Sequence, residues 1–137
     1  MEMIIDFPGG ARVDAHFGPF TVPTDQPAHA AGSAASAPTP FATFLAALGT
    51  CAGFYVLSFC QRRGIATAGI RLVQQTETDR DTGMVRLVRL DIELPADFPE
   101  QYRAAVIRAA DQCAVKKLLE HPPAFEIRTV ARDVAHT

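Results

Sequence analysis

Apolar and polar residues alternate in short runs at the start of the chain, with turn residues between the runs. Residues 3–7 form the first run, and in residues 13–17 apolar side chains occupy every second position, which is the period of a half-buried strand. Gly and Pro residues at 8–10 and 18–19 supply turns, and a third short strand is expected over 20–22. The pattern predicts a small antiparallel meander.

A long uncharged stretch follows, because residues 26–61 contain no Lys, Arg, Asp or Glu. Thr39 can cap a helix whose first turn holds Pro40, where a missing N–H costs nothing. Arginines at 62 and 63 suit the last turn, and Gly64 suits the position after it. This central helix would be roughly 35 Å long. Its apolar part is also about the length that crosses a bilayer, but small and polar residues dilute it, so we interpret it as a buried helix of a protein outside the membrane.

Two further alternating runs, 70–78 and 84–94, flank a turn at 79–83 and predict a hairpin with one solvent-exposed face. Beyond them, apolar residues recur at helical spacing from Tyr102 towards Cys113. Asp111 can cap a second short helix that ends near His121.

Residues 125–131 predict a last strand. The order is therefore strands, a helix, a hairpin, helices and a strand. It predicts an α+β fold with antiparallel sheets around a long central helix.

Length and charge narrow the class of protein. The 137 residues suffice for a single domain over 1–137, and the net charge of −2 gives no basic surface for nucleic acid or for an anionic membrane. The chain has three cysteines but no CxxC pair, and it has no His pair at ligand spacing. We therefore expect no zinc site, no other metal and no cofactor. An N-terminus with acids and no basic residues is unlike a secretory signal, so we expect a cytoplasmic protein with reduced thiols.

Two cysteines are the main chemical candidates. Cys51 lies in the middle of the predicted central helix, and Cys113 is expected in the first turn of the short helix that Asp111 caps, where unpaired N–H groups stabilise a thiolate. If they meet, one thiolate can attack a peroxide and the other can form a disulfide with the resulting sulfenic acid. The alternative is that both are buried packing residues, as we expect for Cys60 in the same helix.

Two segments around these cysteines resemble motifs of the OsmC/Ohr family. The segment PFATFLAALGTCAG, which begins at Pro40, resembles the first motif, with a proline, an apolar helical stretch and a cysteine eleven residues on. The segment AADQCAVKKLL, which begins at Ala109, is similar to the second cysteine motif. The run Phe125-Glu-Ile fits the closing strand of the family.

The resemblance implies an intertwined homodimer of OsmC-like subunits with active sites at the interface. It implies a thiol peroxidase that reduces small organic hydroperoxides and is recycled by an external dithiol or lipoyl-type reductant. By the same resemblance, Cys51 is the peroxidatic thiol and Cys113 the resolving thiol.

This chain departs from the family motif at the residues that activate the thiol. Well-studied members have an acidic residue after the motif proline and an arginine shortly before it. Here Phe41 follows Pro40, and residues 24–39 contain no arginine. Either subunit could supply a substitute, and the candidates are Arg12, His16, Asp25 and His29.

The substrate site and two other function classes stay open at this point. Four aromatic side chains near Cys51 could shape a pocket for a hydrophobic peroxide, although such residues more often lie in the core. They are Phe41, Phe44, Phe54 and Tyr55. A non-enzymatic relative that binds a small apolar ligand, or senses oxidation without turnover, fits the missing activating pair. A Cys–His hydrolase is a third class, with histidines at 16, 29, 121 and 136.

Overall fold

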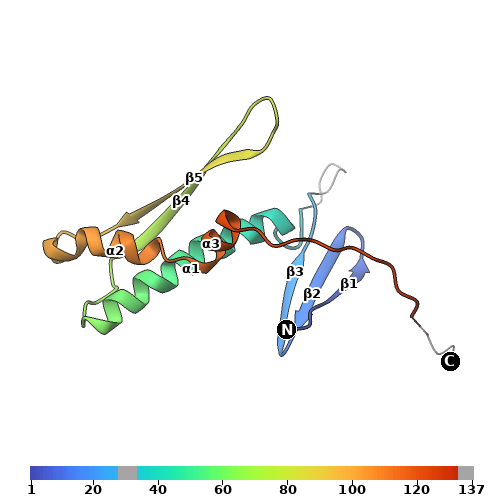
Figure 1. The fold of residues 1–137 in the computed structure, drawn as a ribbon, viewed down its shortest axis with the longest axis horizontal. Coiled ribbons are helices and arrows are strands. Elements are labelled where there is room, and N and C mark those ends of the chain that lie inside the picture. The colour runs from blue at the N-terminus through green and yellow to red at the C-terminus, as the bar shows by residue number, and fades with distance from the viewer. Residues whose placement is uncertain (28–33, 133–137) are drawn as a thin grey trace.

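A three-stranded antiparallel sheet opens the fold, as the alternation predicts. The computed structural model describes residues 1–27 and 34–132, and its first strands are β1 (Ile4–Gly9), β2 (Arg12–Phe17) and β3 (Phe20–Thr24). β2 lies in the middle of the order β1-β2-β3. Figure 1 shows this sheet beyond the N-terminal end of the long helix.

The long helix α1 (Pro40–Arg62) follows the predicted limits closely. The Thr39 hydroxyl accepts a hydrogen bond from the Ala42 N–H at 3.1 Å, and Pro40 occupies the first turn. Gly64 ends the helix at φ 63°, a conformation that favours glycine because it has no β-carbon. Backbone chemistry at both ends therefore explains where α1 begins and ends.

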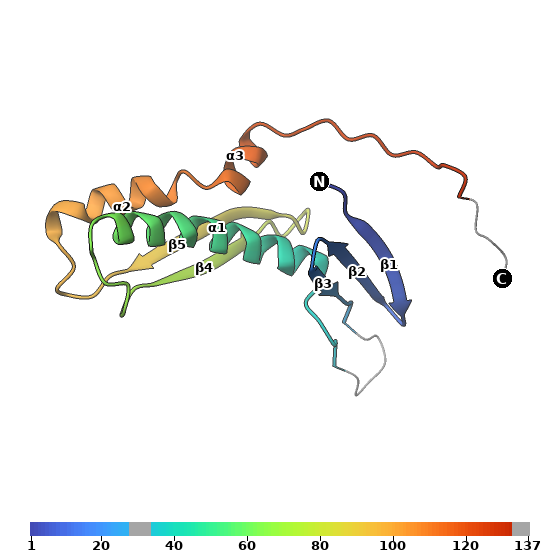
Figure 2. The same ribbon diagram turned by 90° about the horizontal axis from the view of Figure 1, so that it is seen from below.

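The hairpin of β4 (Arg71–Thr78) and β5 (Val85–Glu93) is also confirmed. Leu72 is the register partner of Ile92, and both pack against the buried side of α1. The opposite face carries charged residues, among them the ion pair between Arg71 and Glu93. Figure 2 shows the hairpin alongside α1.

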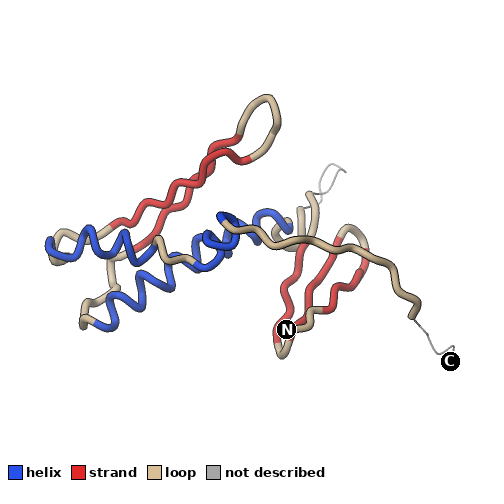
Figure 3. The backbone as a smooth tube through the Cα atoms, viewed as in Figure 1, coloured by secondary structure: helices blue, strands red, loops and turns tan. Residues whose placement is uncertain are grey.

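The C-terminal helices differ in one detail from the prediction. A 3-10 turn, η1 (Glu100–Tyr102), leads into α2 (Arg103–Ala110), and α3 (Ala114–Glu120) follows (Figure 3). Asp111 does not cap α3, because its N–H closes the end of α2 by bonding the Ile107 carbonyl. The N-cap is Cys113 itself, so this thiol precedes the first turn of α3 instead of lying within it.

The prediction of a strand over 125–131 is wrong for a single chain. The segment after α3 pairs with no strand in the described part of the chain and extends away from α1. Phe125 is 86% exposed and Ile127 is 96% exposed. A strand forms only when its N–H and C=O groups pair with the edge of another strand, and this segment lies on none of the open edges of the two sheets.

The core lies between α1, α2 and the hairpin. Nine apolar residues in the described part of the chain are buried there: Leu48, Ala52, Val56, Phe59, Cys60, Phe98, Val106, Ala110 and Cys113. Among the described helices, only α1 is long and apolar enough to cross a bilayer. It supplies five of the nine core residues, and its other side remains exposed at Phe54 (60%) and Leu57 (37%).

The fold therefore has the expected α+β class, with antiparallel sheets and a long central helix.

Candidate active site

The structure brings Cys51 and Cys113 together. Cys51 lies on the flank of α1 and is partly exposed, whereas Cys113 lies between α2 and α3 and is only 3% exposed. Both are free thiols, and each lies close enough to the other to shift its pKa. Two sulfurs that are 62 positions apart in the sequence thus share one site.

Cys113 is held by contacts on two sides. Its Sγ accepts a hydrogen bond from the Lys116 N–H at 3.4 Å, which is the capping bond of α3. It also lies 3.8 Å from the Leu48 carbonyl, to which the S–H donates. These contacts fix the start of α3 against α1, about one turn before Cys51.

The surroundings give the two thiols opposite acidities. The N–H of Val115 donates to the sulfur of Cys51 and is the main reason that the pKa of Cys51 is lowered. Burial opposes this effect, while the Cys113 side chain and the Ala114 N–H add to it. Burial is the main reason that the pKa of Cys113 is raised, and contact with Cys51 raises it further. The site therefore favours a thiolate at Cys51 and a protonated thiol at Cys113.

Cys60 takes no part in this pair. It is fully buried in the core, and burial raises the pKa of its thiol. Its role as a packing residue agrees with the sequence interpretation.

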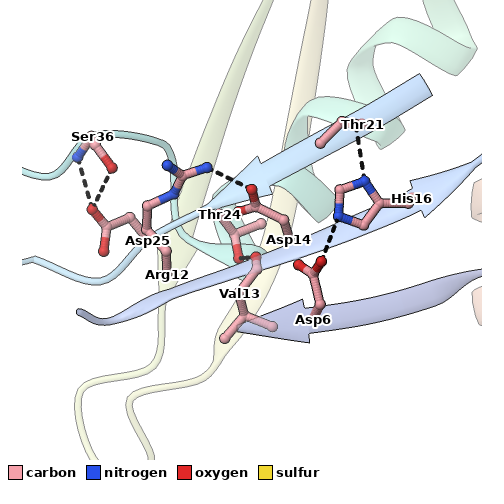
Figure 4. A network of polar contacts seen from close by, with 9 residues as sticks. All are labelled: Asp6, Arg12, Val13, Asp14, His16, Thr21, Thr24, Asp25 and Ser36. Atoms are coloured by element: carbon pink, nitrogen blue, oxygen red, sulfur yellow. Dashed lines mark hydrogen bonds and ion pairs between the residues drawn. The ribbon is translucent and has the colours of Figure 1, made fainter. Parts of the chain in front are cut away.

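The candidate activating residues lie elsewhere in the chain. Arg12 and His16 are on β2, where Arg12 pairs with Asp14 and His16 contacts Asp6 and Thr21 (Figure 4). Neither is among the groups that shift the pKa of Cys51 or Cys113.

Asp25 links the start of the segment before α1 to Ser36 near its end. Its carboxylate accepts hydrogen bonds from the Ser36 N–H at 2.9 Å and the Ser36 hydroxyl at 2.8 Å. These bonds, with that from the Gln26 N–H, lower the pKa of Asp25. Like Arg12 and His16, Asp25 is not among the groups that shift the pKa of either thiol. His29, the fourth candidate, lies outside the described residues.

The four aromatic candidates form two pairs along α1. The rings of Phe41 and Phe44 are 5.9 Å apart, and those of Phe54 and Tyr55 are 5.7 Å apart. Phe41 and Phe54 are more than half exposed. Phe41 and Phe44 lie two to three turns before Cys51, and Phe54 and Tyr55 lie about one turn after it, so the four rings do not enclose the thiol within a single chain.

A groove that sequence reasoning missed lies between the hairpin and the helices α2 and α3. It has a volume of about 770 Å³ and is lined largely by apolar side chains of these elements and α1. Cys113 lines it, but Cys51 and the four aromatic candidates do not. The alternation of apolar residues along β5 was the only sequence signal for one of its walls.

The comparisons with known proteins agree with this fold. A sequence profile of OsmC-like proteins matches residues 32–128. A solved structure of an osmotic stress induced and detoxification response protein from Psychrobacter arcticus 273-4 has 18% identity and a TM-score of 0.67, and the match covers 84% of this chain and 85% of that one. Another solved structure, from structural genomics, has 21% identity and a TM-score of 0.63, with 89% and 91% covered. No curated protein matches the chain.

Proposed function

Because this chain belongs to the OsmC-like family, whose general role is peroxide detoxification under stress, we propose that it is a thiol peroxidase for organic hydroperoxides. The observation that carries the proposal is the proximity of Cys51 and Cys113 across α1 and the start of α3, with the pKa of the first lowered and that of the second raised. An ordinary pair of buried packing cysteines would have both pKa values raised by burial.

The first step uses the thiolate of Cys51. It attacks the terminal oxygen of the hydroperoxide, so that an S–O bond forms and the O–O bond breaks. The alkoxide takes a proton from water and leaves as an alcohol. The N–H groups of Val115 and Ala114 favour the thiolate of Cys51 without a cation, because backbone donors stabilise a charged sulfur.

The second step uses Cys113 as the resolving thiol. Its sulfur attacks the sulfenic acid of Cys51, an S–S bond forms, and the hydroxyl leaves with the Cys113 proton as water. Because each thiol lies close enough to shift the pKa of the other, the disulfide needs only a local rearrangement. A dithiol from outside then reduces the disulfide and restores the pair.

The active form in this proposal is a cytoplasmic, intertwined homodimer. Two apolar surfaces of one chain lack a cover and support this part of the proposal. One is the outer side of α1 with Phe54 and Leu57, and the other is the sheet face with Ile5 (51% exposed) and Phe20 (62% exposed). A second subunit could also bring Arg12, His16 or Asp25 towards Cys51, which its own chain does not do.

The test is to add cumene hydroperoxide to the fully reduced protein and to follow thiol loss by mass spectrometry. Wild type should lose two thiols and gain a disulfide between the Cys51 and Cys113 peptides. Cys113→Ser should stop at a sulfenic acid on Cys51, and Cys51→Ser should react at least about a hundredfold more slowly, as expected when the activated nucleophile is lost. Cys60→Ser is the matched control and should behave as wild type. Full peroxide consumption by Cys51→Ser would contradict the proposal.

One observation favours a second function, an oxidation sensor without turnover. Among the described residues, no cationic side chain contributes to the lowered pKa of Cys51. A sensor would form the disulfide once and would consume one equivalent of peroxide even with excess dithiol present. Repeated turnover, measured as peroxide consumed per subunit, separates the enzyme from the sensor.

A further inference from the structure

The first turn of α3 bonds to the sulfur atoms of the candidate site. Cys113 is the N-cap of this helix, and its Sγ accepts the Lys116 N–H at 3.4 Å. The N–H groups of Ala114 and Val115 donate instead to the sulfur of Cys51, where they favour the thiolate. An α-helix leaves its first N–H groups without partners inside the helix, and here the two thiols supply the acceptors.

The helix itself is short and lies at the surface. α3 has seven residues, none of which is buried, and Val115 packs only partly against the core. Helices shorter than about 12 residues are marginal in water on their own. The ion pairs of Lys116 with Asp111 and Glu120 are exposed, and exposed pairs stabilise a fold only slightly. The first turn of α3 therefore depends strongly on its caps.

The S–H group of Cys113 connects the start of α3 to α1. It donates to the Leu48 carbonyl, with 3.8 Å between sulfur and oxygen. The N–H of the same residue bonds the Ala110 carbonyl at the end of α2 at 3.2 Å. One buried residue thus links α1, α2 and α3, and its bond to α1 exists only while its sulfur carries a proton.

Oxidation of the pair to a disulfide changes these sulfur contacts together. The Cys113 sulfur loses its proton and can no longer donate to the Leu48 carbonyl. The Cys51 sulfur can no longer be a thiolate, and hydrogen bonds to a charged acceptor are about twice as strong as those to a neutral one. The two sulfurs must also approach to about 2.05 Å, so at least one of them leaves its present position.

We propose that the Cys51–Cys113 pair is a redox switch for α3, in which the reduced thiols hold the first turn of the helix and the disulfide releases it. The inference concerns the regulation of the proposed peroxidase site and rests on the disulfide of that cycle.

The switch follows the electrons of the cycle. When the disulfide forms, the hydroperoxide takes two electrons from the two thiols, and its O–O bond is split to give an alcohol and water. An external dithiol returns two electrons and two protons, and the first turn of α3 forms again. Because the N–H groups of that turn favour the Cys51 thiolate, the helix and the reactive thiol are restored in the same step.

The first experiment compares amide hydrogen exchange, resolved by NMR, in reduced and in diamide-oxidised protein. Diamide oxidation needs no peroxidase activity. The N–H groups of Val115 and Lys116 should exchange at least about fivefold faster in the disulfide form, the effect of losing one helix cap. The Asp79 N–H, which bonds the Met84 carbonyl in the hairpin at 2.8 Å, should exchange equally in both forms. Equal or slower exchange of Val115 and Lys116 after oxidation overturns the proposal.

Two substitutions separate the loss of the cap from the formation of the disulfide. Serine is among the preferred N-cap residues, whereas alanine has no acceptor. In reduced protein, Cys113→Ala should speed exchange at Lys116 about fivefold, and Cys113→Ser should keep the wild-type rate. Neither variant should respond to diamide. Wild-type exchange in reduced Cys113→Ala would show that the sulfur does not hold the turn.

A second experiment measures the reverse coupling, because a helix that is released by oxidation must in turn favour the reduced pair. Leu118 is the fifth residue of α3 and is 54% exposed, and Ile107 is the fifth residue of α2 and is 62% exposed. In a glutathione redox buffer, Leu118→Gly should favour the disulfide about fivefold over Leu118→Ala, since glycine weakens only the form that contains the helix. Ile107→Gly and Ile107→Ala should not differ, because α2 is present in both forms.

The outcomes separate this inference from the proposed peroxidase. Failure of cumene hydroperoxide to form the disulfide that diamide forms would overturn the peroxidase, while the exchange rates would still decide the switch. Peroxide turnover with no difference between Leu118→Gly and Leu118→Ala would overturn the switch alone. Absence of a Cys51–Cys113 disulfide after diamide treatment would overturn both.

Discussion

The side-chain amide of Gln74 on β4 lies directly over Gly49 on α1. Its Nε2 donates a hydrogen bond to the Leu45 carbonyl at 2.9 Å. A β-carbon at position 49 would come within 2.8 Å of its Oε1. The hairpin is thus joined to α1 about half a turn before Cys51, at a position where only glycine leaves room for the amide.

Gly49→Ala should leave the free energy of unfolding nearly unchanged. Alanine favours a helix over glycine by about 1 kcal/mol. The new methyl group forces the Gln74 amide aside, which costs its hydrogen bond, about 1 kcal/mol. Urea unfolding of Gly49→Ala, Gln74→Ala and the double variant measures the coupling. In the Gln74→Ala background, the same change should stabilise the protein by about 1 kcal/mol.

Gly53 provides the matched control for this comparison. It lies one turn further along α1, and a β-carbon there would contact Leu72 Cδ2 at an ordinary 3.9 Å. Gly53→Ala should therefore stabilise wild type by about 1 kcal/mol, with or without Gln74. An equal gain from Gly49→Ala and Gly53→Ala in wild type would mean that the Gln74 amide does not constrain position 49.

The two active-site thiols should titrate in opposite directions from a free cysteine. Alkylation by iodoacetamide requires the thiolate, so its rate falls about tenfold for each pH unit below the pKa. Cys51 should stay reactive below pH 8.5, the approximate value for a free thiol, because the Val115 N–H lowers its pKa. Cys113 should react only at higher pH, because burial raises its pKa.

Variants of the partner thiol test the origin of these shifts. Cys113→Ala removes one of the contacts that lower the pKa of Cys51, so the Cys51 profile should move to higher pH. Cys51→Ala removes a contact that raises the pKa of Cys113, so that profile should move to lower pH. Profiles of Cys51 and Cys113 that coincide in wild type would contradict the assigned roles.

Periodicity and capping residues were enough to predict most of this fold. Thr39, Pro40 and Gly64 marked the ends of α1 because local backbone chemistry alone determines such ends. The cap of α3 was misplaced by two residues, since Asp111 and Cys113 can both accept an N–H. The choice depended on how α2 ended. The strand expected over 125–131 needs a partner edge, which no local pattern supplies.

The sequence predicted only part of the candidate site. Motif resemblance selected Cys51 and Cys113 together, although spacing alone could not show that they lie close together in the fold. The main donor that lowers the pKa of Cys51 is the backbone N–H of Val115. Because every residue except proline carries such a group, the residue type at position 115 could not predict this role. Arg12, His16 and Asp25 were selected by charge, and their nearest partners belong to the sheet and the segment before α1.

The carboxylate of Asp25 should stabilise the fold in a pH-dependent manner. Hydrogen bonds, chiefly from the Ser36 N–H, depress its folded pKa below the unfolded value of about 3.9. The stabilisation is therefore complete above the unfolded pKa and is lost as the pH falls through the folded pKa. Asp25→Ala should lower the Tm at pH 7, and the difference from wild type should shrink below about pH 4.

The exposed side of α1 provides the sharpest test of the proposed dimer. Leu57 is 37% exposed on the side of the helix away from the core, close to Phe54 at 60%. If a second subunit covers this side, a carboxylate at position 57 would be buried without a partner, at a cost of several kcal/mol per site. Leu57→Asp should therefore elute as a single chain in size-exclusion chromatography, whereas wild type should elute as two. Met84→Asp replaces an apolar residue that is 70% exposed near the hairpin turn, and it should remain dimeric. A wild-type protein that elutes as one chain at micromolar concentration would refute the dimer. The exposed apolar side of α1 would then need another explanation.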